Sequence, residues 1–259
     1  MQNNTFLTLF VGQSLVKLSE IDSTNNYLKK QLSNTKPLAE GTVIMADHQF
    51  AGRGQQGNSW AAAKGKNLTI SILLYPTFIA AKQQFCLNKA ISLGINDCLT
   101  AIIGDDCKIK WPNDIFYEDK KLGGVLVENV AAGSHLKASV VGIGINVNQL
   151  DFDDALQNSA VSLVKILQHD YPLNNLLKQL CKSIEKRYLQ IKEQGIGCLD
   201  DDYLCRLYRF GRWHKYQIAD KIIDGCIKGV SPQGHLLLQT HDELLRLDLK
   251  QVRFIFNSE

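Results

Sequence analysis

The stretch from Cys107 to Val147, CKIKWPNDIFYEDKKLGGVLVENVAAGSHLKASVVGIGINV, contains three segments with the apolar composition of β-strands. They cover residues 107–111, 123–130 and 135–147. The connections EDK and AAGS are short enough for hairpins, so these strands should be antiparallel neighbours in one sheet. Repeated strand–helix–strand units would need longer connections. The stretch therefore predicts a mixed, largely antiparallel sheet.

The segments on either side predict an α+β fold, in which helices accompany this sheet. Further strands are expected at residues 14–21, 42–46 and 67–75, and helices at 26–32, at 83–103 and across 159–208, with breaks at Pro172 and near Gly195 and Gly197. After Gly211 the chain changes to short strands with turns at IDG, SPQG and THDE. We therefore expect two domains, residues 1–209 and 210–259, the second small and all-β.

The overall composition narrows the class of protein. The chain has 259 residues, 45% of them hydrophobic, and a formal net charge of +3 without a basic run, which argues against a nucleic-acid partner. No apolar stretch approaches the roughly 18 residues that span a bilayer, and the start lacks the features of a secretory signal. Seven scattered cysteines without a C-x-x-C favour free thiols in a reducing cytoplasm, and the six histidines show no metal-ligand spacing.

Residues 51–60, AGRGQQGNSW, form a glycine-rich loop that cannot build a core, because Gly52, Gly54 and Gly57 have no side chain to bury. Bare backbone of this kind can approach a ligand closely, often an anion, and Arg53 adds a forked positive charge. The loop fits the dinucleotide-binding spacing G-x-G-x-x-G, but a strand follows it where that motif requires a helix. Nor does it contain the G-K-S/T of a phosphate-binding P-loop. A dinucleotide fold is therefore not expected.

Polar residues also interrupt the three strands of the 107–147 stretch. Lys110 ends one strand before Asn113 and Asp114, Lys121 precedes a Gly-Gly pair in the next, and Asn146 lies in an apolar strand. Taken singly, the lysines could be solvated charges, Asn113 and Asp114 an Asx turn, and Asn146 a hydrogen-bonded core amide. Taken together with the loop, they could bring two anions together, as nucleotidyl transfer requires. The residues by themselves indicate an anion or nucleotide site.

Four blocks, GRGQQGNSW, KWPNDI, KLGGVLVE and GIGINVN, resemble in order and spacing the signature motifs of biotin protein ligases. The lesser blocks DSTN (22–25) and GKNLTIS (65–71) agree, and GVSPQGHLLL (229–238) is similar to the C-terminal β-domain of that family. The resemblance implies the family's ligase fold for residues 1–209 and a small barrel-like β-domain for 210–259. Because DSTN already occurs at residue 22, the family's N-terminal DNA-binding domain is expected to be missing.

The resemblance also implies a reaction and its partners. Biotin and MgATP would give biotinyl-5′-AMP, from which biotin passes to one lysine of a biotin carboxyl carrier domain. The cofactors implied are ATP and Mg²⁺, with biotin as substrate. No DNA, no membrane and a cytoplasmic location are expected, with a homodimer possible. Two alternatives stay open: a lipoate ligase or octanoyltransferase, and a biotin-sensing regulator without catalysis.

The resemblance carries the family's site residues onto this sequence. The catalytic residues would be Lys121, Arg53 and Asp114. Biotin would be bound by Ser23, Thr24, Asn25, Gln49, Gly52, Arg53, Gly54, Gln55, Lys121, Gly123 and Gly124. ATP would be bound by Arg53, Gln55, Asn58, Trp60, Lys110, Asn113, Lys121 and Asn146, and Mg²⁺ by Asn146. For Trp60, a packing role is an equal alternative.

The loop is expected to act as a lid that orders over the ligand and opens again, which its glycines permit. It departs from the family pattern at Gln55, Gln56 and Asn58, where arginines are common. Fewer charged contacts to a phosphate are therefore expected.

Overall fold

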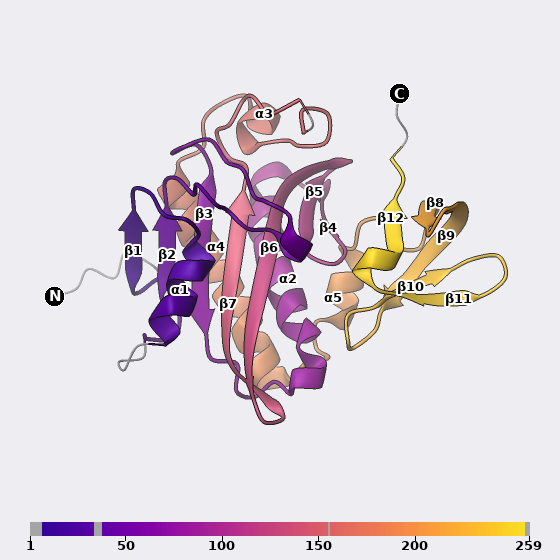
Figure 1. The fold of residues 1–259 in the computed structure, drawn as a ribbon, viewed down its shortest axis with the longest axis horizontal. Coiled ribbons are helices and arrows are strands. Elements are labelled where there is room, and N and C mark those ends of the chain that lie inside the picture. The colour runs from indigo at the N-terminus through magenta and orange to yellow at the C-terminus, as the bar shows by residue number, and fades with distance from the viewer. Residues whose placement is uncertain (1–6, 34–37, 155, 257–259) are drawn as a thin grey trace.

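A seven-stranded sheet lies at the centre of the protein, as the computed structural model, which describes residues 7–33, 38–154 and 156–256, shows (Figure 1). Its order is β1-β2-β3-β7-β6-β5-β4. The strands are β1 (Leu15–Leu18), β2 (Val43–Ala46), β3 (Leu68–Leu74), β4 (Cys107–Lys110), β5 (Asp114–Tyr117), β6 (Lys120–Ala132) and β7 (His135–Ile145). Only β1 and β2 pair in parallel, and the other neighbours are antiparallel. The predicted mixed, largely antiparallel sheet is confirmed.

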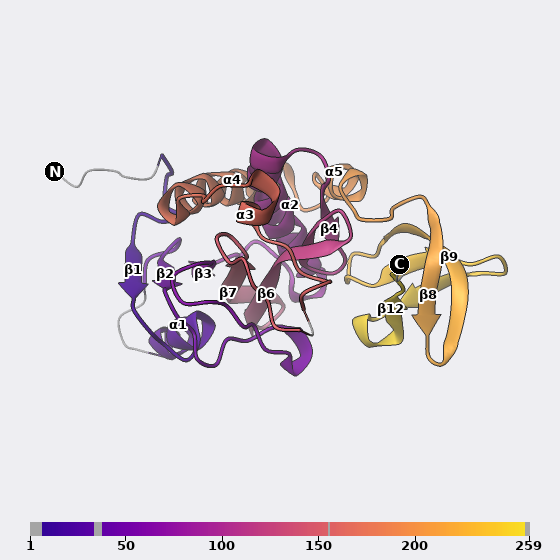
Figure 2. The same cartoon turned by 90° about the horizontal axis from the view of Figure 1, so that it is seen from above.

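Helices cover both faces of this sheet. They are α1 (Thr24–Leu32), α2 (Phe85–Ile103), α3 (Leu163–Leu167), α4 (Leu173–Gln194) and α5 (Asp200–Cys205). Figure 2 shows α2 to α5 on one side of the sheet and α1 on the other. The breaks expected in residues 159–208 separate α3, α4 and α5. The fold class is therefore α+β, as expected.

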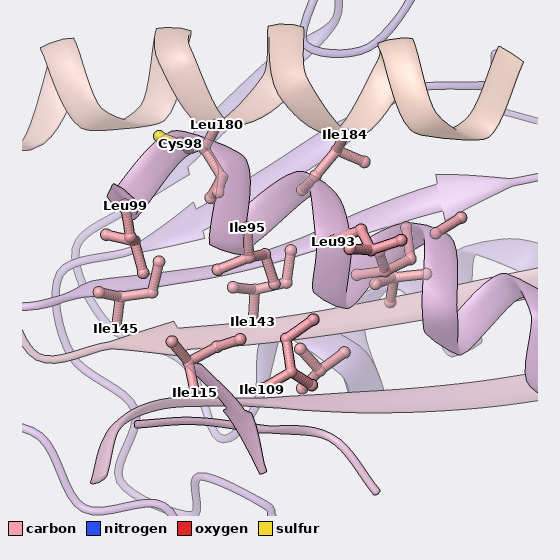
Figure 3. Packing of buried hydrophobic residues seen from close by; sticks show 14 of the residues in the cluster. Leu93, Ile95, Cys98, Leu99, Ile109, Ile115, Ile143, Ile145, Leu180 and Ile184 are labelled. Atoms are coloured by element: carbon pink, nitrogen blue, oxygen red, sulfur yellow. The ribbon is translucent and has the colours of Figure 1, made fainter. Parts of the chain in front are cut away.

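The main core lies between the sheet and the helices α2 to α5. Figure 3 shows α2 sandwiched, with Leu180 and Ile184 of α4 on one side and Ile143 of β7 on the other. A Cβ at Gly94 would lie 2.7 Å from the Cα of Ile184, so this glycine lets the two helices approach closely. No helix of this kind was expected from the sequence: by length and composition α2 could cross a membrane. In the structure, however, α2 is largely buried as a core helix.

Side chains alternate in direction along the central strands, so every second residue faces away from the main core, toward the face of the sheet that carries α1. In β7, Ile143 and Ile145 point into the core under α2, whereas Gly142 and Gly144 face the other way. In β3, Ser71 likewise faces away from that core, toward the start of α1. Since side chains alternate with a period of two, small and polar residues gather on this second face.

Two local expectations were wrong. Strands 107–111 and 123–130 are not neighbours, because β5 lies between them and pairs with both β4 and β6. It has only four residues between the WPN turn and EDK, too few to show a clear alternation in sequence. The sequence IDG lies inside β9 (Lys221–Val230), and the chain turns instead after β8 (Trp213–Ile218), at Ala219, where φ is +51°.

The C-terminal strands form a second, five-stranded antiparallel sheet of order β11-β10-β9-β8-β12. Its other strands are β10 (Leu236–Gln239), β11 (Leu244–Leu247) and β12 (Val252–Phe254). Within the described residues its end strands β11 and β12 do not pair with each other, so the sheet is open and not a closed barrel. That residues 210–259 form a domain of their own stays a prediction.

Hydrogen bonds beside the WPND turn tie the central sheet to the segment after α5 and to the second sheet. The amide of Ile109 in β4 donates to the carbonyl of Arg206 at 2.9 Å, and its carbonyl accepts from the amide of Tyr208 at 2.8 Å. The indole Nε1 of Trp111 donates to the carbonyl of Gly234, in the turn between β9 and β10, at 2.9 Å. The C-terminal sheet therefore supports the segment that carries Asn113 and Asp114.

Candidate active site

One cavity on the second face of the central sheet brings the sequence motifs together. All the residues assigned from the sequence line it except Gly52, Gly123 and Asn146. It is lined by Ser23, Thr24, Asn25, Gln49, Arg53, Gly54, Gln55, Gln56, Asn58, Ser59, Trp60, Thr69, Ile70, Lys110, Pro112, Asn113, Asp114, Lys121, Gly124, Val125, Leu126, Gly142, Ile143, Gly144 and Leu249. These residues span most of the chain, so only the folded sheet assembles the site.

A buried polar turn at the start of α1 forms one part of the cavity. The backbone amide and the hydroxyl of Thr24 donate to Oε1 of Gln49 at 2.8 and 3.0 Å. The Ser71 hydroxyl lies 2.7 Å from Oγ1 of Thr24 and 2.5 Å from Oδ1 of Asn25. A Cβ at Gly142 would lie 2.5 Å from that Oδ1, so glycine is needed there. The turn is thus a fixed set of donors and acceptors, suited to a polar ring.

The glycine loop folds back over the sheet beside this turn. The amide of Trp60 donates to the carbonyl of Gly52 at 2.9 Å, and the amide of Gly54 donates to the carbonyl of Asn58 at 2.7 Å. A Cβ at Gly52 would lie 2.3 Å from the carbonyl oxygen of Trp60. Glycine is therefore needed at position 52 because the two ends of the loop approach each other closely there. The short η1 helix (Gln55–Gly57) forms its tip.

The Trp60 indole packs on the bare backbone of Gly144. A Cβ built there would lie 2.4 Å from Cε2 of the ring. The indole Nε1 is buried and has no hydrogen-bond partner in the described protein. Trp60 therefore packs on the sheet, as the packing alternative expected, and its assignment to ATP binding stays a prediction.

Two lysines and one carboxylate form the charged part of the cavity. Nζ of Lys121 lies 2.7 Å from Oδ1 of Asp114, across the β5–β6 pair. Nζ of Lys110 lies 5.1 Å from the ring centre of Phe116 and 4.6 Å from that of Phe254 in β12. Burial lowers the pKa of Lys110, and the positive charge of Lys121 lowers it further, against the attraction of Asp114. An anion here would meet the ammonium groups of both lysines, of which Lys121 is paired with Asp114.

Two of the residues assigned to ATP binding, Asn113 and Asn146, hydrogen-bond to the protein's own backbone. Asn113 lines the cavity, but its amide donates to the carbonyl of Val125. Asn146 is buried behind the cavity, where Nδ2 donates to the carbonyl of Val161 at 3.1 Å, as the core-amide alternative proposed. Magnesium binding by Asn146 stays a prediction that this placement does not favour. In the described ranges no three His, Cys, Asp or Glu residues cluster as metal ligands.

Arg53 points away from the lysine pair. Its guanidinium donates to Oδ1 of Asn26 at 2.8 Å and to both carboxylate oxygens of Glu128 at 3.0 and 3.2 Å. The loop arginine thus lines the cavity without meeting Lys121 or Lys110 in these contacts. Its assignment as a catalytic and phosphate-binding residue stays a prediction.

Several residues around the cavity were not singled out from the sequence. For Ser71, a hydroxyl in an otherwise apolar strand was the available signal, and for Glu128, a charge at the end of KLGGVLVE. Leu249 and Phe254 had none, because they reach the site through the packing of the second sheet.

Comparison with known proteins agrees with this geometry. Residues 18–146 match the Biotin/lipoate A/B protein ligase family. The bifunctional ligase/repressor BirA of Bacillus spizizenii is 30% identical over 246 residues, which cover 93% of this chain and 74% of that protein. The biotin–[acetyl-CoA-carboxylase] ligase of Paracoccus denitrificans is 27% identical over 86% of this chain and 92% of its own length.

Solved structures give the same result. The biotin protein ligase of Aquifex aeolicus in complex with biotin and ATP superposes with a TM-score of 0.76 and 28% identity, over 94% of this chain and 99% of that one. Sequence and fold therefore agree over nearly the whole chain. The chain belongs to the biotin/lipoate A/B protein ligase family, among its biotin protein ligases.

Proposed function

We propose that the protein activates biotin with ATP and transfers it to a lysine of a biotin carboxyl carrier domain. One observation carries the proposal: a polar turn and a cationic pair share one cavity. Asn25 packs against Gly142, and Lys121 packs against Gly124, which pairs with Gly144. Positions 142 and 144 are two residues apart, about 7 Å along the strand. A small molecule with a hydrogen-bonding ring at one end and a carboxylate at the other, such as biotin, suits this arrangement.

The proposed chemistry has two steps. A carboxylate oxygen of biotin attacks the α-phosphorus of ATP, the bond to the β-phosphate oxygen breaks, and pyrophosphate leaves. The acceptor amine then attacks the carbonyl carbon of biotinyl-5′-AMP, the carbon–oxygen bond breaks, the amine loses a proton, and AMP leaves. Lys121 and Lys110 would hold the charge that gathers at the phosphate in the first step. The polar turn would fix the ring so that the carboxylate meets the phosphate.

The donor set is compatible with magnesium carried by the nucleotide. Asp114 is the one carboxylate among the described lining residues. Mg²⁺ at nucleotide sites commonly uses one or two protein carboxylates together with phosphate oxygens. When bound, the ion would add positive charge at the phosphates, and Asp114 would be its protein ligand in place of Asn146. A homodimer, the absence of DNA binding and a cytoplasmic location stay predictions from the sequence.

The test is ATP–pyrophosphate exchange on the purified protein. Exchange should require biotin, and lipoate or octanoate should not replace it. With a carrier domain added, labelled biotin should appear on one lysine of that domain. Equal exchange with lipoate would support the acyl-ligase alternative instead. Adenylate formation without any transfer would support the regulator.

A further inference from the structure

Glu128, in β6, is the point where three separate segments meet. Its carboxylate accepts hydrogen bonds from Nζ of Lys29 in α1 at 2.9 Å and from Nδ2 of Asn25 at 2.9 Å. It also accepts both contacts from the guanidinium of Arg53, in the glycine loop. Burial raises the pKa of Glu128, but the hydrogen bonds from Lys29, Asn25 and Arg53 outweigh it and hold the pKa below its usual value. The carboxylate is therefore ionised at neutral pH.

The hydrogen bonds of the Arg53 guanidinium lie on the α1 and β6 side of the cavity. Its head group binds Glu128 and Asn26, and Asn26 in turn donates to a carboxylate oxygen of Asp22 at 2.8 Å. Glu128 follows Lys121 by seven positions in the same strand, roughly 20 Å along β6. The Arg53 head group is therefore well away from the charged pair where the phosphate would lie.

The loop is thus attached to the sheet at two places. At its start Arg53 pairs with Glu128, and at its end the Trp60 indole packs on Gly144. Both attachment points belong to neighbouring strands, β6 and β7, on the face that carries the cavity. The tip of the loop, Gln55–Gly57, has no buried residue to hold it down. Closure of the loop over the cavity therefore depends on the two ends.

We propose that Glu128 is a positioning residue that holds the glycine loop closed, by pairing with Arg53 and joining it to Asn25 of the polar turn. Arg53 would then act through closure and not through the phosphate. This rests on the proposed function, since what the loop encloses is taken to be biotin and its adenylate. Losing the pair should let the ligand escape faster without changing the chemical step.

The experiment compares Glu128→Gln, Arg53→Ala and the double variant with wild type. Lys29→Ala is the matched control, because it removes a cation from the same carboxylate without touching the loop. The first readout is amide hydrogen exchange of residues 52–60 in the ligand-free protein. Because the pair is partly exposed, we expect exchange about three- to fivefold faster in either single variant. The double variant should be no faster than the singles, and Lys29→Ala should match wild type.

The second readout is kinetic. The KM for biotin and the release rate of labelled biotinyl-5′-AMP should rise by the same factor in Glu128→Gln and Arg53→Ala, and kcat for exchange should be unchanged in Glu128→Gln. A charge-swapped variant, Arg53→Glu with Glu128→Arg, should recover part of the protection. It also tests the pair if Glu128→Gln proves too unstable, which its melting temperature would show.

Two results would overturn the proposal. One is additive effects of Arg53→Ala and Glu128→Gln on loop exchange, which would mean that the pair does not act as a unit. The other is a lower kcat in Arg53→Ala alone, which would place the guanidinium on the phosphate. If biotin supported no exchange at all, the proposed function would fail, but the ligand-free hydrogen exchange would still decide the role of Glu128.

Discussion

Replacing Gly144 by alanine tests whether the Trp60 indole holds the loop closed. A Cβ there would lie 2.4 Å from Cε2, 2.6 Å from Cζ2 and 2.8 Å from Nε1 of that ring. Carbon atoms in contact prefer about 3.5–4.0 Å, so the indole must move by roughly 1 Å away from β7. Overpacking of this kind costs about 1–3 kcal/mol. We therefore expect the closed loop to be weakened about tenfold, which corresponds to about 1.4 kcal/mol.

The assay follows the release of labelled biotinyl-5′-AMP together with amide exchange of residues 52–60. In Gly144→Ala, release should be about tenfold faster, and the loop should lose protection to a similar extent. Gly229→Ala is the control, because it adds a methyl group to another strand glycine, where the Cβ would meet only Leu237 Cδ1 at an ordinary 3.7 Å. Its release rate should equal that of wild type.

The new methyl group could also touch the ligand directly, so the effect must be traced to the indole. If it acts through Trp60, then Gly144→Ala added to Trp60→Ala should change release no further than Trp60→Ala alone. A full tenfold effect that persists in the Trp60→Ala background would refute the reasoning. So would wild-type release and loop exchange in a folded Gly144→Ala protein.

Three further changes give distinct expectations. Lys121→Ala should reduce biotin-dependent exchange on the order of 10²-fold or more, as when a transition-state donor is removed, and a folded variant with full exchange would make this lysine a strand-edge charge. Gln55→Arg should slow adenylate release about tenfold by adding a charge-assisted contact, and an unchanged release rate would show that another cation already serves. Asp97→Asn should lower the free energy of unfolding at pH 7 by about 2–3 kcal/mol, since burial raises the pKa of Asp97 but the hydrogen bonds from Arg187 and Arg206 lower it overall. Because the pKa of Asp97 is lowered in the folded state, this stability is present above pH ~4 and is lost at lower pH. Urea unfolding should therefore show that the difference in free energy of unfolding between wild type and Asp97→Asn shrinks in acid. A difference that stays constant with pH would contradict this.

The site could be predicted from sequence as far as its residues are local to motifs. Lys110, Asp114 and Lys121 lie within 12 residues of one another and are joined by tight turns, so their clustering follows from short-range chain geometry. The glycine loop was also recognisable, because its glycines cannot build a core, whereas the polar turn at Thr24 was assigned to the site through the resemblance. Their common location in one cavity followed from the resemblance, and the sheet order accounts for it.

What was missed depends on contacts between distant segments. The pairing of Arg53 with Glu128 joins residues 75 positions apart, and the ring of Phe254 reaches Lys110 from the second sheet. A charged residue in a strand gives no indication of its partner, because many registers place an opposite charge within reach. β5 was missed for the related reason that four residues carry too little periodicity.

The sequence by itself determined the type of each long element, the hairpin at 131–134 and the residues of the motifs, because period-two alternation, helical spacing and turn chemistry are properties of neighbouring residues. Only the tertiary structure decided that Asn146 hydrogen-bonds within the core, that Gly52 lets the two ends of the glycine loop approach each other, and that Arg53 pairs with Glu128. Each of these depends on which strands lie side by side and which side chains then compete for the same space and hydrogen-bond partners. That competition is settled by packing across the sheet, which local pattern does not encode.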